Sequence, residues 1–143
     1  MKVIIAIDQT GNWKQIIEAT VKRSWPSDTI FRILTVVEPV ETPLDKPKTH
    51  HESAADKVVH EARALLFKHL PGCTVYSEVR KGKPADELVT VAANWMVDRI
   101  ILGTHGRQAN RLIPGTVPQL VTKNSCCSVD LVKLTPAAAA AAQ

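Results

Sequence analysis

The chain has 143 residues, enough for one domain with a substantial core and short for two. Hydrophobic residues make up 45% and charged residues 22%, as in ordinary soluble domains, and no apolar run approaches the length of a signal peptide or membrane span. The net charge of +4 is spread along the chain and aromatic residues are only 4%, which argues against DNA or RNA binding. We therefore expect a cytoplasmic protein that binds neither nucleic acid nor membrane.

Short apolar runs alternate with segments of helical periodicity along the chain. The run at 2–8 is typical of a strand buried on both faces. Asn12 followed by Gln15 resembles a capping box, and the apolar residues behind it predict a helix that ends before Pro26. The run at 31–37 predicts a second strand, and the Pro-rich stretch after it predicts a surface loop.

The middle of the chain predicts a long helix and an edge strand. The helix is expected at about 51–69, and the alternating, half-exposed run at 73–80 predicts a strand at the edge of a sheet. The apolar stripe of this helix comprises Ala55, Val58, Val59, Ala62, Leu65, Leu66 and His69.

Two further helix–strand units complete the pattern. Pro84 is placed to open a helix before a strand at 99–102, and Thr116 to open a short helix before a strand at 128–134. The apolar face of the helix that begins at Pro84 comprises Leu88, Val89, Ala92, Trp95 and Met96. This alternation predicts an α/β fold, a parallel sheet with helices on both faces. We expect a single domain over 1–135 and a disordered Ala-rich tail at 136–143.

Ligands of open parallel sheets bind beyond the carboxyl ends of the strands, where the strand order reverses. Asp8 is the one acidic residue in the stretch after the first strand, IDQTG. Because Asn12 is better placed to cap the following helix, we expect the Asp8 carboxylate to be available to a ligand hydroxyl or amine.

The stretch GTHGRQANRLIPGT at 103–116 follows the fourth strand. Gly103 and Gly106 allow backbone N–H groups to approach a ligand closely, and Gly115 and Thr116 stand at a helix start, which favours anions. The residues alone leave phosphate binding and plain turn geometry both open.

These features together resemble the universal stress protein family. The matching pieces are IIAID, VVEP, GKPADEL and LGTHGR followed by GTV, and they extend over the chain to about residue 134. The resemblance implies a five-stranded sheet of order 3-2-1-4-5 and a homodimer formed through the last strand, here 128–134. It also implies binding of ATP, with or without magnesium.

The resemblance carries the family's nucleotide contacts onto positions of this chain. Asp8 would meet the adenosine and the backbone of Val36 the adenine. The other implied contacts are Gly103 and Gly106 beside the ribose and phosphates, and Gly115, Thr116 and Val117 at the phosphates. Arg107 and Arg111 are either phosphate partners or solvated loop residues.

One departure weighs against a working site. The family has nine residues between its second and third glycines, whereas RQANRLIP between Gly106 and Gly115 has eight, and Pro114 and Pro118 each lack a backbone donor. Two hypotheses follow: a nucleotide-responsive stress-response regulator, or a dimeric interaction module that has lost the site. We predict no catalytic residues and no metal site, and at most slow ATP hydrolysis.

Overall fold

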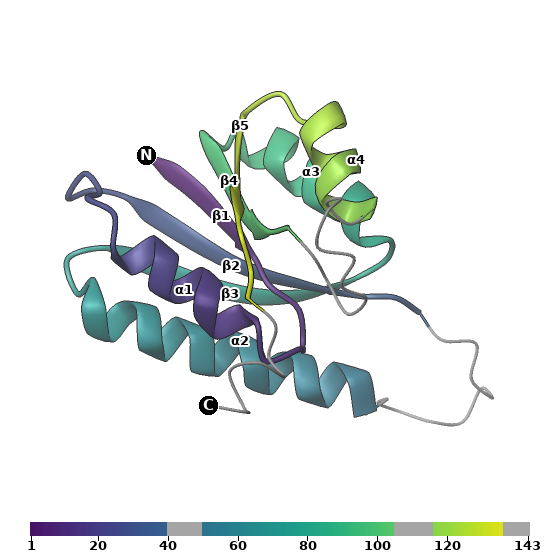
Figure 1. Cartoon of the computed structure of the whole chain (residues 1–143), viewed down its shortest axis with the longest axis horizontal. Helices are drawn as coiled ribbons and strands as arrows, with labels where there is room; N and C mark the ends of the chain where they lie inside the picture. The colour runs from purple at the N-terminus through teal and green to yellow at the C-terminus, as the bar shows by residue number, and fades with distance from the viewer. Residues whose placement is uncertain (40–49, 105–115, 136–143) are drawn as a thin grey trace.

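A computed structural model describes residues 1–39, 50–104 and 116–135, with the backbone alone at 50–53. Strands and helices alternate along these residues (Figure 1). The elements are β1 (Lys2–Ala6), α1 (Trp13–Val21), β2 (Ile30–Val37), α2 (His50–His69), β3 (Thr74–Lys81), α3 (Pro84–Trp95), β4 (Arg99–Gly103), α4 (Thr116–Asn124) and β5 (Ser128–Val132). None of these helices is long and apolar enough to cross a membrane.

The five strands form one sheet of order β3-β2-β1-β4-β5. Every neighbouring pair is parallel, so the predicted α/β fold and strand order are confirmed. β3 and β5 are the edges, as the alternating pattern at 73–80 predicted for β3. The central strand β1 pairs with β2 on one side and β4 on the other, which is where the strand order reverses.

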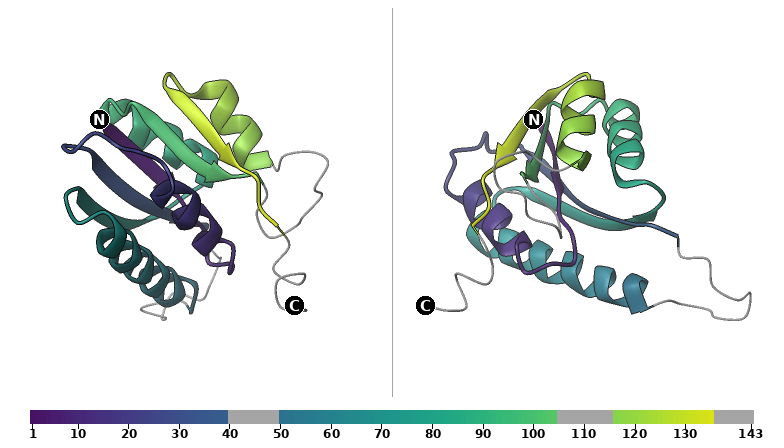
Figure 2. Two further views of the ribbon diagram at one scale, coloured as in Figure 1. Left: turned by 60° about the vertical axis from the view of Figure 1, so that its left-hand side comes forward. Right: turned by 45° about the vertical axis from the view of Figure 1, so that its right-hand side comes forward.

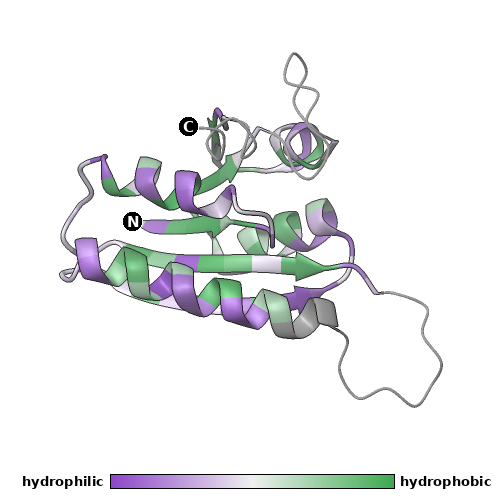
Figure 3. Cartoon of the chain, turned by 60° about the horizontal axis from the view of Figure 1, so that its bottom comes forward, coloured by the Kyte–Doolittle hydropathy of each residue, from purple (hydrophilic) through white to green (hydrophobic). Residues whose placement is uncertain are grey.

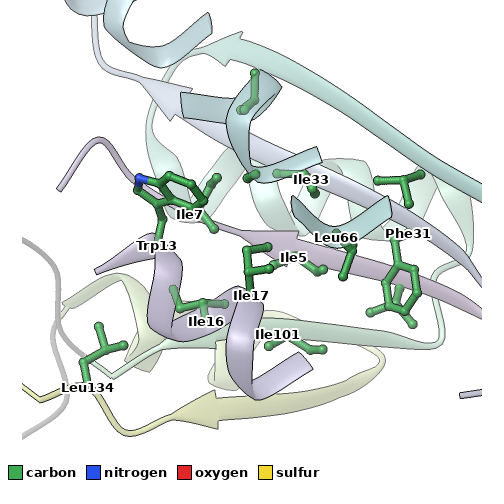
Figure 4. Packing of buried hydrophobic residues seen from close by; sticks show 14 residues of the cluster. Ile5, Ile7, Trp13, Ile16, Ile17, Phe31, Ile33, Leu66, Ile101 and Leu134 are labelled. Carbon is green, nitrogen blue, oxygen red and sulfur yellow. The ribbon is translucent and has the colours of Figure 1, made fainter. Parts of the chain in front are cut away.

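The helices cover both faces of the sheet, α1 and α2 on one and α3 and α4 on the other (Figures 1 and 2). Each face has its own apolar cluster, and the hydrophobic sides of the helices turn toward the strands (Figure 3). Under α1, Trp13, Ile16 and Ile17 pack onto residues of β1 and β4 (Figure 4). This burial is the main favourable term in folding and holds the strand ends in place.

Two residues predicted on apolar helix faces are exposed. Met96 is 80% exposed because α3 ends at Trp95 and Met96 adopts a left-handed conformation, φ 54° and ψ 53°, which turns its side chain away. His69, the last residue of α2, is exposed at the helix end. Within α2 the other residues of the predicted stripe are buried or partly buried, whereas in α3 the buried Val91 was not on the predicted apolar face.

Replacing Met96 with glycine is expected to stabilise the protein. The left-handed conformation costs a residue with a Cβ about 1 kcal/mol relative to glycine, and an exposed methionine loses little packing when removed. Met96→Gly should therefore raise the free energy of unfolding by about 0.5–1 kcal/mol in urea titrations. Met96→Ala, which keeps the Cβ, should not; an equal gain in both variants would contradict this explanation.

β5 ends at Val132, two residues earlier than predicted, and β1 ends at Ala6 rather than residue 8. Within β5, the Asp130 carboxylate accepts hydrogen bonds from Arg99, at 2.7 Å, and from Arg23, two residues after the end of α1. Burial by itself raises the pKa of Asp130, but the hydrogen bonds from the two guanidinium groups outweigh it and hold that pKa below its ordinary value.

Asp130→Asn is expected to reduce the pH dependence of stability in acid. A depressed pKa contributes stability above the unfolded-state pKa of about 3.9, and this contribution is lost as the pH falls through the lower folded-state pKa. The wild type should therefore exceed the variant in free energy of unfolding at pH 7, with the difference shrinking below about pH 4. Urea titrations from pH 7 to pH 2 measure this, with the exposed Glu18→Gln as control. A difference independent of pH would refute it.

Candidate functional site

The carboxyl end of β1 is held by contacts with β2 that continue past the last residue of the strand. The Ile7 N–H donates to the Leu34 carbonyl at 3.0 Å, and the buried Thr35 hydroxyl donates to the Ile7 carbonyl at 2.9 Å. Asp8 follows Ile7, and Val36 follows Thr35. These two bonds therefore set the separation between Asp8 and Val36.

Asp8 closes a tight turn on Thr10. Asp8 Oδ1 accepts hydrogen bonds from the Thr10 N–H, at 2.9 Å, and from the Thr10 hydroxyl. The expectation that Asp8 is free because Asn12 caps α1 is wrong: Asn12 makes no side-chain cap bond and lies in the helical rather than the extended region. Asn12 Oδ1 is buried without a hydrogen-bond partner in the part of the chain described. Gln15, the other half of the expected capping box, instead bonds to Thr135.

Asp8, Val36 and Gly103 lie at the end of the sheet that the carboxyl termini of its strands form. Asp8 follows the central strand β1, Val36 is near the end of β2, and Gly103 ends β4. β2 and β4 flank β1 on its two sides, so the structure brings these three predicted residues to the position where parallel sheets bind ligands. Asp8, Val36 and Gly103 are all partly exposed there.

Gly103 has a packing role that the sequence did not predict. A Cβ built on Gly103 would lie 2.5 Å from Leu134 Cδ1, closer than real Cβ contacts, and 3.4 Å from Ile16 Cδ1. Leu134 is 8% exposed and joins the apolar cluster beneath α1 (Figure 4). A Cβ at 103 would therefore force Leu134 or the end of β4 to shift, whether or not a ligand approaches.

Thr116 and Val117 open α4, as predicted. Thr116 is exposed and Val117 packs partly against the core under α3. Gly106, Arg107, Arg111 and Gly115 lie outside the described residues, so the middle of the glycine-containing stretch remains a prediction.

Among the described residues at the carboxyl ends of the strands, the start of α4 is suited to an anion. Arg80 of β3 lies opposite Val36 of β2 in the strand register. Its Nε donates a hydrogen bond to Glu87 Oε1 at 2.9 Å. The first N–H groups of a nine-residue helix and its dipole suit a negative group beside Thr116. Pro118 removes one of these donors and is itself buried in the core. Within the described ranges, no group of three or more His, Cys, Asp or Glu side chains could hold a metal ion.

Sequence reasoning missed Thr10 and Thr35, which orient the site. An Asp two residues before a Thr is a known turn pattern and could have revealed the Asp8–Thr10 pair. Thr35 carried no local signal, because its partner Ile7 lies in another strand.

Thr35→Val is expected to destabilise the protein more than Thr35→Ser. Valine keeps the shape but leaves the buried Ile7 carbonyl without its donor, which should lower the free energy of unfolding by about 1–3 kcal/mol. Serine keeps the hydroxyl and loses one methyl group. In equilibrium unfolding, the serine variant should retain most of the stability that the valine variant loses. Equal stabilities of the two variants would contradict a structural role for the hydroxyl.

Curated relatives match part of the chain. A universal stress protein from Methanocaldococcus jannaschii is 36% identical over 63 residues, 43% of this chain and 37% of that protein. One from Methanothermobacter thermautotrophicus is 33% identical over 71 residues, 50% of this chain and 49% of that protein. This chain thus spans about half the length, or less, of the curated relatives it matches.

Solved structures share the fold over nearly the whole chain. A family member from Arabidopsis thaliana with AMP bound has a TM-score of 0.74 at 16% identity and covers 98% of each chain. A universal stress protein in complex with cAMP has a TM-score of 0.68 at 19% identity, covering 94% of this chain and 98% of that one. One from Archaeoglobus fulgidus in complex with dAMP has a TM-score of 0.62 at 15% identity, with the same coverage. At these identities the likeness concerns the fold.

The family model for universal stress proteins matches residues 1–133. That match takes in all five strands and the edge where Asp8, Val36 and Gly103 meet. This chain therefore belongs to the universal stress protein family.

Proposed function

We propose that this chain binds an adenine nucleotide, with ATP and magnesium as the first candidates, and acts in the cytoplasm as a nucleotide-responsive dimeric regulator. The meeting of Asp8, Val36 and Gly103 at the sheet's reversal point is the observation that carries this proposal. The adenosine would lie between Asp8 and Val36, and the phosphates beside Gly103 and the start of α4. Gly106, Arg107 and Gly115, with Thr116 and Val117, complete the proposed contacts.

Related proteins support the ligand class. Solved structures of the same fold contain AMP, cAMP or dAMP, which share the adenine base and one phosphate. In this chain a carboxylate at the adenosine end and a helix start at the phosphate end fit that common chemistry.

Isothermal titration of the purified protein tests the proposal. ATP, ADP and AMP are titrated with and without magnesium, and GTP serves as the control for base recognition. Saturable heat with an adenine nucleotide at micromolar concentrations, and much weaker binding of GTP, is the expected result. An absence of heat with every adenine nucleotide, up to high micromolar concentrations, would sink the proposal.

The dimer is proposed to form through β5, the free edge of the sheet. The opposite edge strand β3 is partly covered, because Arg63 of α2 donates to the Val75 carbonyl at 2.9 Å. At β5, Leu131 is 40% exposed. An exposed apolar residue on an open strand edge fits pairing with a second copy.

Leu131→Pro tests this edge. The Ser128 N–H and Val132 carbonyl both bond toward β4, so the alternation of a strand directs the Leu131 N–H outward. Proline there removes an outward donor without removing a β4–β5 bond. Sedimentation should show a dimeric wild type and a monomeric Leu131→Pro, with Leu131→Ala retaining the backbone donor and part of the dimer. A folded Leu131→Pro that remains dimeric would exclude β5 pairing.

The alternative is an interaction module that has lost nucleotide binding. The short spacing between Gly106 and Gly115, the Pro118 in the first turn of α4 and the occupation of the space beside Gly103 by Leu134 favour it. Mass spectrometry of the protein purified without added ligand separates the two functions. Co-purified adenine nucleotide would exclude the module.

A further inference from the structure

The end of β5 and the residues after it contact Thr104, next to Gly103, and Gln15 in the first turn of α1. The Thr104 N–H donates to the Val132 carbonyl at 3.0 Å, and the Leu134 N–H donates to the Thr104 hydroxyl at 3.4 Å. Residues 132–135, here named the C-terminal strap, thus continue from the edge strand to the start of the glycine-containing stretch.

The strap also holds the first turn of α1. The Gln15 carboxamide donates through Nε2 to the Thr135 carbonyl at 3.0 Å, and its Oε1 accepts from the Thr135 N–H at 2.8 Å and from the Thr135 hydroxyl at 3.1 Å. These three hydrogen bonds between Gln15 and Thr135 hold the end of the strap against α1, the helix that follows the Asp8 turn.

Between the hydrogen bonds to Thr104 and to Gln15, Leu134 packs into the apolar cluster beneath α1. Leu134 fills the space that a Cβ on Gly103 would occupy, and Ile16 of α1 closes that space from the other side. Because close-packed side chains transmit small shifts instead of absorbing them, a displacement of β5 would reach Gly103 and Thr104 through Leu134.

We propose that the C-terminal strap couples strand pairing at β5 to nucleotide affinity at the carboxyl edge of the sheet. This inference rests on the proposed function and names the device that regulates it. Pairing of β5 with a second copy sets the position of Val132, Leu134 sets that of Gly103, and Gln15 holds the strap in register with α1. Coupling of this kind is reciprocal: nucleotide strengthens or weakens the dimer by the same factor by which dimerisation changes nucleotide affinity.

The test compares the wild type with Gln15→Ala, and uses the exposed Glu18→Ala in the same helix as the matched control. Sedimentation gives the dimer dissociation constant with and without saturating AMP or ATP. In the wild type and in Glu18→Ala, nucleotide should change this constant by about fivefold or more. In Gln15→Ala, the ratio of the dimer dissociation constants with and without nucleotide should fall to near one, while the protein still dimerises and still binds nucleotide. The same ratio in all three proteins, a ratio of one in the wild type, or a monomeric wild type would overturn the proposal.

A second measurement needs no nucleotide. Amide hydrogen exchange at Thr104, Leu134 and Thr135 should accelerate about tenfold in Gln15→Ala and not in Glu18→Ala, because the strap then opens locally. Unchanged amide exchange at Thr104 in Gln15→Ala would overturn the proposal that the strap links α1 to Thr104, even if the protein binds nucleotide. Conversely, an absence of nucleotide heat with accelerated exchange would reject the proposed function and the coupling but retain the mechanical link. The two failures are therefore distinguishable.

Discussion

Gly103→Ala is expected to lower the free energy of unfolding by about 1–3 kcal/mol, the range for overpacking a filled core. The added Cβ would stand 2.5 Å from Leu134 Cδ1, so that Leu134 or the end of β4 must shift. Equilibrium unfolding in urea measures the loss. Gly72→Ala is the matched control, because a Cβ built on Gly72 meets nothing within 4 Å. A Gly103→Ala variant as stable as the control would show that the space beside Gly103 adjusts freely.

Leu134→Ala completes a double-mutant cycle with Gly103→Ala. Alone it should cost about 2–4 kcal/mol, because it removes a side chain that is 8% exposed. Once Leu134 is truncated, the Cβ at 103 has room, so the double variant should be less destabilised than the sum of the two single variants. Additive losses would mean that the two residues do not share the space.

The same cycle separates the packing role of Gly103 from its proposed ligand role. If Gly103 serves nucleotide binding only through Leu134, the double variant should bind nucleotide better than Gly103→Ala alone. If the ligand itself needs the space above Gly103, truncating Leu134 should restore no affinity. Titration calorimetry on the four proteins of the cycle decides between these roles.

Asp8→Asn is expected to weaken adenine-nucleotide binding roughly 10- to 150-fold, because hydrogen bonds to a charged group are worth about 1.5–3 kcal/mol. Asparagine retains a side-chain oxygen that can accept from Thr10, so the turn after β1 should persist. The fold should therefore remain near wild-type stability while affinity falls.

The control for Asp8→Asn is Asp28→Asn, an exposed carboxylate in the turn before β2, at the opposite end of that strand from Val36. Asp28→Asn makes the same change in net charge far from the site, and its affinity for adenine nucleotide should match that of the wild type. If Asp8→Asn binds as tightly as the control, the adenosine does not lie against Asp8 and the proposed orientation of the ligand is wrong.

Much of the fold follows from local sequence patterns. Apolar runs and helical periodicity predicted every strand and helix described here. A helix buried on one face shows apolar residues at helical spacing, and a strand buried on both faces shows a continuous apolar run, so both can be read from neighbouring residues. Element ends were predicted less well. The left-handed Met96, and the termination of β5 at Val132, depend on hydrogen bonds that no periodicity records.

The candidate site shows the same division. The sequence by itself determined the kinds of residue at the strand ends, Asp8 after one apolar run and glycine after another, and the family motifs gave their expected roles. Only the tertiary structure decided that Thr35 positions the Asp8 turn and that Leu134, thirty-one residues beyond Gly103, fills the space beside it. The reason is physical: strand pairing and core packing join residues far apart in the chain, and such contacts leave no pattern among neighbours in the sequence.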